Sequence, residues 1–158
     1  MPRHAYKRLE VKTDPVYDSY EVAKLINYIM LDGKKNVARK LVYDAIEELK
    51  KDNAEDPLKV LHKAIANVSP TVEVRPRRLG GASYLVPVEV RKARKIYLAL
   101  NWIVDAANSR SNKEFHSYTE KLVAEVRDAA ANTGAAITKR QQVEKMAEAN
   151  KAFAHLKW

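Results

Sequence analysis

The spacing of apolar residues changes once along this chain, and that change limits the folds that the sequence can adopt. In two short stretches between residues 71 and 91, apolar side chains recur at every second position, as Val72 and Val74 do first and Val86 and Val88 do later. Elsewhere they recur at spacings of three and four. A period of two is typical of strands, and a spacing of three and four is typical of amphipathic helices. The sequence therefore predicts helices interrupted by one extended segment.

The extended segment has the features of a β-hairpin. Gly80-Gly81 lies between its two halves, and paired glycines favour the tight turns that join antiparallel strands. Pro76 and Pro87 would disrupt a central strand, but both strands of a two-stranded ribbon are edge strands, where proline is tolerated. An isolated hairpin is marginal in water. We therefore expect an arm over about residues 71–91 whose root packs on helices and whose tip meets a partner.

Six helices are predicted, three before the arm and three after it. Asp18, Ser111 and Thr138 are each followed three residues later by Glu or Gln, the pattern of a capping box, and are taken as helix starts. Asp56-Pro57 is a further start, with aspartate as the cap and proline in the first turn. The last helix is expected to turn its apolar residues inward: Val143, Met146, Ala149 and Phe153.

The chain length fits this helical architecture with one core. At roughly 100–200 residues per domain, 158 residues predict a single domain, residues 1–158. The predicted fold class is mainly α: a six-helix domain with an extended two-stranded β-hairpin arm between helices 3 and 4. A basic N-terminal tail over about residues 1–17 is expected to become ordered on binding a partner.

Positive charge is concentrated in three parts of the chain. Lys and Arg total 29 against 20 Asp and Glu, a net charge of +9. Residues 1–12 carry a net charge of +3, residues 34–40 contain four basic residues and no acid, and residues 75–95 contain seven basic residues against Glu89 alone. Arginine forms paired hydrogen bonds with phosphate and stays charged. This distribution predicts a polyanionic partner.

The sequence contains no pattern that indicates catalysis or a membrane segment. There is no cysteine, the four histidines form no metal-binding or catalytic motif, and four glycines cannot provide a nucleotide-binding loop. No stretch approaches the roughly 20 apolar residues that span a bilayer, and the N-terminal residues are too polar for a secretory signal. We expect a cytoplasmic protein that is not an enzyme and has no cofactor and no bound metal.

Three interpretations remain open from the residues alone. The first is a helical domain with a cationic arm that binds structured nucleic acid, and Tyr84 would either stack on a base or pack across the ribbon. The second is a helical DNA-binding regulator with a recognition helix in the major groove, although the densest basic run lies on the arm and its root. The third is a basic enzyme whose site is assembled only in space.

Four stretches of the sequence resemble one known family. They are the run from Glu73 to Arg91, Asp14-Pro15-Val16-Tyr17, the run from Lys24 to Lys35, and the run from Met146 to His155. Together they resemble the bacterial-type small-subunit ribosomal protein seven family over essentially the whole chain. The chain departs from the usual family pattern in residues 138–142, in residues 156–158 and at Asn101.

The resemblance implies a non-enzymatic protein of the small ribosomal subunit. Members of this family bind the 3′ major domain of small-subunit rRNA and nucleate assembly of the subunit head. The arm would lie near the exit-site tRNA and the mRNA path, with Gly80, Gly81 and Tyr84 as the tRNA-proximal part. The last helix would face small-subunit ribosomal protein eleven. Transferred residue by residue, the rRNA contacts fall on Arg3, Lys7, Arg8, Lys34, Lys35, Arg75, Arg77, Arg78, Arg91, Arg94 and Lys95.

Overall fold

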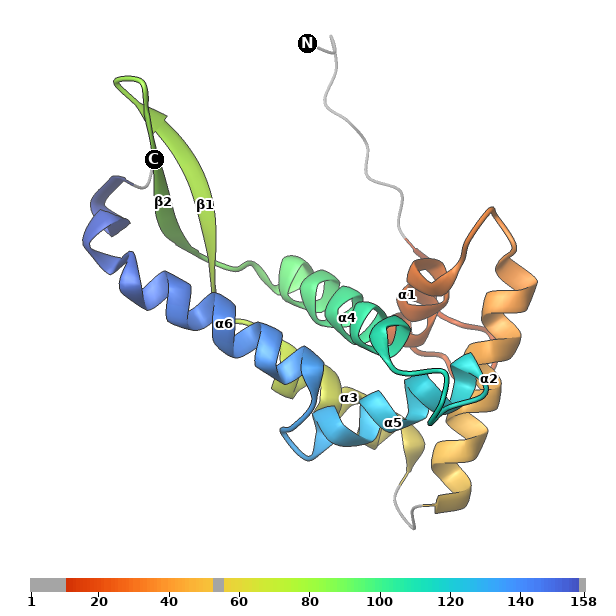
Figure 1. Ribbon diagram of the computed structural model, residues 1–158. Coiled ribbons are helices and arrows are strands. Elements are labelled where there is room, and N and C mark those ends of the chain that lie inside the picture. Colours follow the sequence, from red (N-terminus) through yellow and green to blue (C-terminus); the bar gives the residue numbers. More distant parts are fainter. Residues whose placement is uncertain (1–10, 53–55, 157–158) are drawn as a thin grey trace, which may run out of the picture.

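The predicted order of helices and strands is confirmed in a computed structural model, which describes residues 11–52 and 56–156. Within these ranges there are six α-helices, a short 3₁₀ helix and one antiparallel hairpin between the third and fourth helices (Figure 1). The elements are α1 (Tyr20–Ile29), α2 (Lys35–Asp52), α3 (Pro57–Val68), β1 (Val72–Leu79), β2 (Ala82–Glu89), α4 (Lys92–Ser109), α5 (Tyr118–Ala130), α6 (Ala135–Ala149) and the 3₁₀ helix η1 (Lys151–Leu156).

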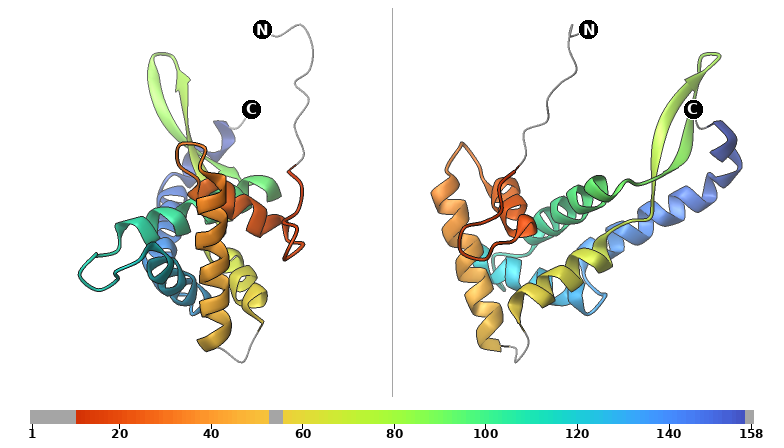
Figure 2. Two further views of the ribbon diagram at one scale, coloured as in Figure 1. Left: turned by 90° about the vertical axis from the view of Figure 1, so that its right-hand side faces the viewer. Right: turned by 180° about the vertical axis from the view of Figure 1, so that it is seen from behind.

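The first five helices enclose one hydrophobic core. Leu61 of α3, Leu100 and Ile103 of α4 and Leu122 of α5 are at most 2% exposed, as is Val22 of α1. Within each helix, buried residues recur at the spacings of three and four that the sequence predicted, as Leu100 and Ile103 do in α4. The helix α6 starts on this body and runs away from it toward the arm (Figures 1 and 2). No helix in the described ranges is long and apolar enough to span a membrane.

The start of α3 is as predicted, but the predicted starts of α1 and α5 are wrong. Asp56 caps α3, with its side chain accepting a hydrogen bond from the backbone of Leu58. An N-cap residue needs an extended backbone. Asp18 has a φ of +44°, so Ser19 caps α1 instead. Ser111 closes only a local turn, and α5 begins after Ser117.

A different capping box begins α5. The Ser117 hydroxyl accepts a hydrogen bond from the Glu120 backbone at 3.2 Å, and the Glu120 carboxylate accepts one from the His116 backbone at 3.0 Å. The first bond satisfies an amide group that the first turn of a helix leaves unpaired, and the second ties the residue before the N-cap to the helix. The bond from His116 lowers the pKa of Glu120 first of all, and the bonds from Ser117 lower it further.

The start and the inward face of the last helix also differ from prediction. Gly134, with a φ of +93°, precedes α6, so the helix begins before Thr138. It ends at Ala149, and Phe153 lies on η1. The predicted inward residue Met146 is 48% exposed, whereas Ala147 is buried. The reason is that only the first turns of α6 face the core of the helical body, whereas its later turns face the end of α3 and the root of the arm, where Arg140 donates a hydrogen bond to the backbone of Asn67 and Glu144 accepts hydrogen bonds from Thr71.

The arm is a regular two-stranded ribbon. Its register runs from Val72 opposite Glu89 to Leu79 opposite Ala82, which leaves a two-residue loop of Gly80-Gly81. These glycines have φ values of +54° and +89°, which other residues rarely adopt. The predicted hairpin and its turn are therefore confirmed. Each strand has eight residues, a length of roughly 27 Å at 3.4 Å per residue.

Candidate nucleic-acid interface

The strand register distributes the arginines of β1 over both faces of the arm. Residues directly opposite each other in an antiparallel pair share a face, and neighbours along a strand alternate. Arg75 lies opposite Val86 and Arg77 opposite Tyr84, so these two arginines share one face. Arg78 lies opposite Ser83, on the other face. The predicted arginines do follow one extended element, but a ligand on one face would meet only some of them.

A buried carboxylate joins the root of the arm to α4. Glu73 is 7% exposed. Its Oε1 accepts a hydrogen bond from Arg75 Nε at 2.7 Å, and its Oε2 accepts one from Arg94 Nε at 3.3 Å. The side chains of Arg75 and Arg94 are still 52% and 45% exposed. Glu73 therefore orients two guanidinium groups while leaving about half of each side chain accessible.

Glu73 is a site residue that sequence reasoning missed. The basic stretch that the sequence indicates, residues 75–95, contains Glu89 as its only acidic residue, and Glu73 lies just before it. With Glu73 included, residues 73–95 contain seven basic and two acidic residues, a net charge of +5. The sequence does contain a signal for this contact: Glu73 and Arg75 are two positions apart on a predicted strand, and such residues share a face.

The first turns of α4 add an exposed aromatic residue to this basic surface. Arg91 is the N-cap of α4, and Lys95 lies one turn further on. The Arg94 guanidinium lies 4.8 Å from the centre of the Tyr97 ring, which is 40% exposed. The rings of Tyr28 of α1 and Tyr97 are nearly perpendicular and meet edge to face, with centroids 5.6 Å apart. Tyr97 was not among the predicted site residues, although its position three residues after Arg94 places it on the same helical face.

Tyr84 makes a contact that neither of its two predicted arrangements included. Gly80 and Gly81 are exposed at the tip, as expected. Tyr84 is half-buried, and its ring centroid lies 5.4 Å from that of Phe153 at an interplanar angle of 54°. Phe153 belongs to η1, which lies beside β2 (Figure 1). Tyr84 thus packs against the C-terminal part of the chain rather than only across the ribbon.

A second basic surface lies where α2 begins. Lys34 precedes α2 and forms an exposed ion pair with Asp32 at 3.9 Å. Lys35 and Arg39 line a groove of about 530 Å³ with Lys12, between residues 11–15, α1 and α2. Within the described chain, the buried Nε of Arg39 has no hydrogen-bond partner. Arg39 was noted in the basic cluster but not among the predicted contacts.

The arm and the start of α2, which carry most of the predicted residues that the structure describes, lie toward opposite ends of the molecule but on the same side of it (Figures 1 and 2). The arm and the loop between α1 and α2 rise from the same side of the helical body in all three views of Figures 1 and 2. The predicted tail residues Arg3, Lys7 and Arg8 lie outside the described residues. The two basic surfaces are therefore placed to contact one extended polyanion.

Comparison with known proteins identifies the family. The model of the family described as ribosomal protein S7p/S5e matches residues 1–151. The chain belongs to this family. Small ribosomal subunit protein uS7 of Thermoanaerobacter pseudethanolicus is 52% identical over 159 residues, covering 100% of both chains. The proteins of the same name from Thermosipho africanus and Dictyoglomus thermophilum are 51% identical over 158 residues, covering all of both chains, and 54% identical over 149 residues, covering 94% of each.

Membership of the S7p/S5e family gives the chain its general role. Proteins of this family are structural constituents of the small ribosomal subunit, bind RNA and are not enzymes. The chain is therefore part of the ribosome and associates with rRNA. Of the three interpretations that the sequence left open, the family agrees with the first. In residues 11–52 and 56–156, no three His, Asp or Glu side chains are grouped as a metal site would require.

Proposed function

We propose that this chain binds the 3′ major domain of small-subunit rRNA directly and nucleates assembly of the subunit head. The observation that carries the proposal is the arrangement of two basic surfaces, on the arm with its root and at the start of α2, along one side of the molecule. In this proposal residues 1–158 act as one rRNA-binding domain, with the tail to about residue 17 and the arm as its extensions.

The phosphate contacts are assigned to exposed or half-exposed cations of these two surfaces and, from the family resemblance alone, to three basic residues of the N-terminal tail. Phosphate contacts release counterions and supply affinity, while the folded shape of the RNA supplies specificity. Glu73 supports this role, because guanidinium groups that are already oriented lose less conformational freedom on binding. Arg39 is added to the contacts implied by the family resemblance. The proposed set is Arg3, Lys7, Arg8, Lys34, Lys35, Arg39, Arg75, Arg77, Arg78, Arg91, Arg94 and Lys95.

The finer placement on the ribosome follows the resemblance to the family. The arm is proposed to lie near the exit-site tRNA and the mRNA path, with Gly80, Gly81 and Tyr84 as the part nearest the tRNA. The last helix is proposed to face small-subunit ribosomal protein eleven and other proteins of the head. The exposed tip and the length of α6 that extends beyond the helical body support these placements. We place the chain on the cytoplasmic ribosome.

A competition experiment tests the proposal. The full chain is titrated with a fragment of the 3′ major domain of small-subunit rRNA and with duplex DNA of the same length, each at two salt concentrations. We expect tighter binding to the rRNA fragment at both, because shape recognition adds to the phosphate contacts. Equal affinity for the two nucleic acids would contradict the proposal and favour a general polyanion-binding protein.

A further inference from the structure

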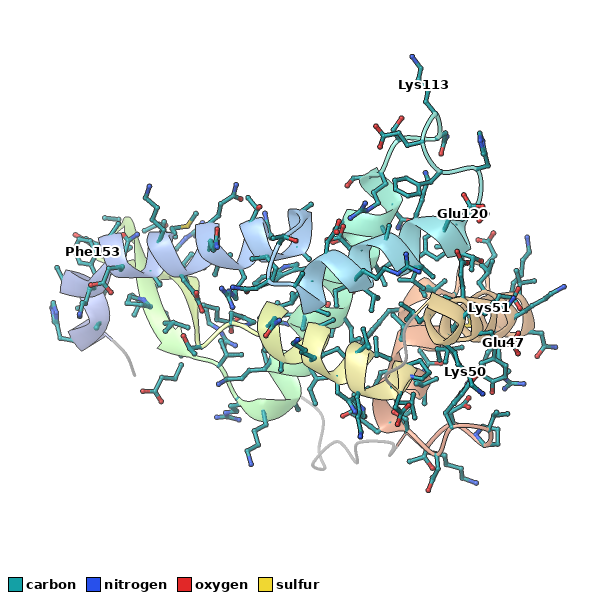
Figure 3. All side chains as sticks on the ribbon, turned by 90° about the horizontal axis from the view of Figure 1, so that it is seen from below. Glu47, Lys50, Lys51, Lys113, Glu120 and Phe153 are labelled. Atoms are coloured by element: carbon teal, nitrogen blue, oxygen red, sulfur yellow. The ribbon has the colours of Figure 1, made fainter. Side chains whose placement is uncertain are left out.

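The C-terminal 3₁₀ helix lies along the outer part of the arm. After α6 the chain turns at Asn150 and continues as η1, which runs beside β2 (Figures 1 and 2). Figure 3 shows Phe153 at the end of the molecule that carries the arm. Its half-buried ring meets the half-buried ring of Tyr84 with centroids 5.4 Å apart. Two residues separated by 69 positions in the sequence are thus in contact.

A second contact holds the arm at its root. Glu144 of α6 accepts hydrogen bonds at 3.4 Å from both the backbone nitrogen and the hydroxyl of Thr71. Val86 of β2 is completely buried, and Ala147 of α6 is 4% exposed. A groove of about 560 Å³, lined in part by Pro87 and Lys151, lies beside these contacts, between the arm and η1 near the root. The arm is therefore held at its root by α6 and further out by η1, with an open groove beside it.

The outer contact matters because a two-stranded ribbon does not fix its own direction. An isolated hairpin is marginal in water and bends and twists easily. An aromatic pair shifts an equilibrium by a factor of about two to ten beyond the area that it buries. Arg77 lies opposite Tyr84 and shares its face. A change in the Tyr84–Phe153 contact is therefore expected to move the part of β1 that carries Arg77.

We propose that η1 is a brace for the arm and that Phe153 is a positioning residue, which acts through Tyr84 to fix the direction of the outer strands. The consequence for RNA rests on the proposed function, whereas the brace itself is a property of the free chain. A partner that displaces residues 151–156 would release the outer arm, and a partner that holds them in place would stiffen it. The C-terminal residues and the arm thus form one linked surface.

Hydrogen exchange of the full-length free chain tests the brace. Phe153→Ala and Tyr84→Ala should each raise the exchange rates of the slow amides of residues 76–85 by about two- to tenfold, while those of α4 stay unchanged. The double variant should add little to either single one, because both remove the same aromatic pair. Phe153→Tyr, which keeps the ring, should restore slow exchange. Lys151→Ala, which removes an exposed side chain of the same 3₁₀ helix whose ion pair with Glu148 is also exposed, is the matched control and should have no effect.

Each other outcome of the exchange experiment decides against the brace. Unchanged exchange in the arm for both Phe153→Ala and Tyr84→Ala would overturn it. An equal rise in the arm and in α4 would also overturn it, because that result indicates general destabilisation. If Phe153→Ala does not fold, Tyr84→Ala decides alone, since Tyr84 lies on the arm and outside the hydrophobic core.

A binding measurement separates the brace from the proposed function. With the rRNA fragment described above, Phe153→Ala should weaken binding by about two- to tenfold, and Phe153→Tyr should restore it. If the unmodified chain showed no preference for the rRNA fragment but the arm still exchanged faster in Phe153→Ala, the proposed function would fail and the brace would stand. If the unmodified chain preferred the rRNA fragment but neither alanine variant changed the exchange of the arm, the brace would fail and the proposed function would stand.

Discussion

The buried carboxylate of Glu125 caps the start of α6 by accepting a hydrogen bond from the backbone nitrogen of Ala136 at 3.0 Å. Its other oxygen accepts hydrogen bonds from Arg110, the C-cap residue of α4, at 2.6 and 3.0 Å. Burial by itself lowers the pKa of Arg110. The hydrogen bonds to Asp128 and Glu125 outweigh this effect, so that the pKa of Arg110 is raised overall. One side chain of α5 thus joins the end of α4 to the start of the helix that carries the brace.

Removing this carboxylate is expected to be costly. Glu125→Ala should lower the free energy of unfolding by about 3 kcal/mol, because it leaves a largely buried guanidinium without one of its partners. Urea unfolding followed by circular dichroism measures the change. Glu114→Ala, which removes an exposed carboxylate from the loop before α5, is the control and should stay within about 0.5 kcal/mol of the unmodified chain. Equal stability of the two variants would show that Glu125 does not join the helices.

Gly134 is predicted to be intolerant of any side chain. Its φ of +93° and ψ of 174° suit glycine almost alone, and an added Cβ would lie 3.0 Å from Asp128 Cβ and 3.2 Å from Glu125 Oε1. Gly134→Ala should therefore lower the free energy of unfolding by about 1–3 kcal/mol. Gly33→Ala, where the backbone is also left-handed but no atom lies within 4 Å of the added Cβ, should cost less. Equal losses of stability in thermal unfolding would mean that the backbone conformation alone matters.

The arginines of the outer arm should determine part of the salt dependence of rRNA binding. Replacing both Arg77 and Arg78 with alanine should reduce the slope of log K against log salt by roughly 0.7–0.9 for each phosphate that the variant no longer neutralises. Replacing Lys50 and Lys51 with alanine changes the net charge equally, but at the end of the molecule opposite Phe153 (Figure 3). This control should leave the slope nearly unchanged. The same decrease for both pairs would show that total charge, rather than the arm, governs binding.

Asp14 fastens the segment before α1 to α2. The carboxylate is 3% exposed and accepts hydrogen bonds from the backbones of Val16 and Tyr17 and from the Tyr43 hydroxyl, which lies 2.9 Å from each oxygen. Burial and the bond to Asp14 raise the pKa of Tyr43 to about 12. Tyr43→Phe should lower the free energy of unfolding by about 1.5–3 kcal/mol, since it removes a hydrogen bond to a buried charge.

Urea unfolding measures the loss of stability, and two further measurements check the hydrogen bond itself. An ultraviolet titration should show one fewer tyrosine ionising near pH 12 in Tyr43→Phe, and the Val16 and Tyr17 amides should exchange faster. Tyr97→Phe, on an exposed ring, is the stability control. A titration curve that keeps its full amplitude near pH 12 would contradict the assignment.

The capping box of α5 should give a pH-dependent part of the stability. The pKa of Glu120 is lowered in the folded chain, so its stabilisation is complete above the ordinary value of 4.5 and is lost as the pH falls through the lowered value. Glu120→Gln should therefore be less stable than the unmodified chain at pH 7, and the difference should shrink below pH 4.5. Urea unfolding at several pH values measures it, with Glu114→Gln as control. A difference that is constant with pH would show that the charge of Glu120 is not involved.

The sequence alone determined the order of helices and strands, the hairpin with its two-glycine turn and the start of α3. These features depend on the backbone preferences of single residues, on helix capping and on the period of apolar residues. All three involve residues only a few positions apart, so they can be recognised in the sequence itself. The clusters of positive charge are likewise a property of the sequence. The helix starts at Asp18 and Ser111 were predicted wrongly because several capping residues stand close together, and the local pattern does not choose between them.

Only the tertiary structure decided how the site is assembled. The inward face of α6 could not be predicted, because it depends on where this helix leaves the body and not on its own spacing. Glu73 and Arg94 are 21 residues apart, and Tyr84 and Phe153 are 69 apart. Contacts over such separations depend on how the helices pack and on the strand register, which places each arginine on one face or the other. The sequence supplies the charges, and the packing decides which of them a ligand can meet.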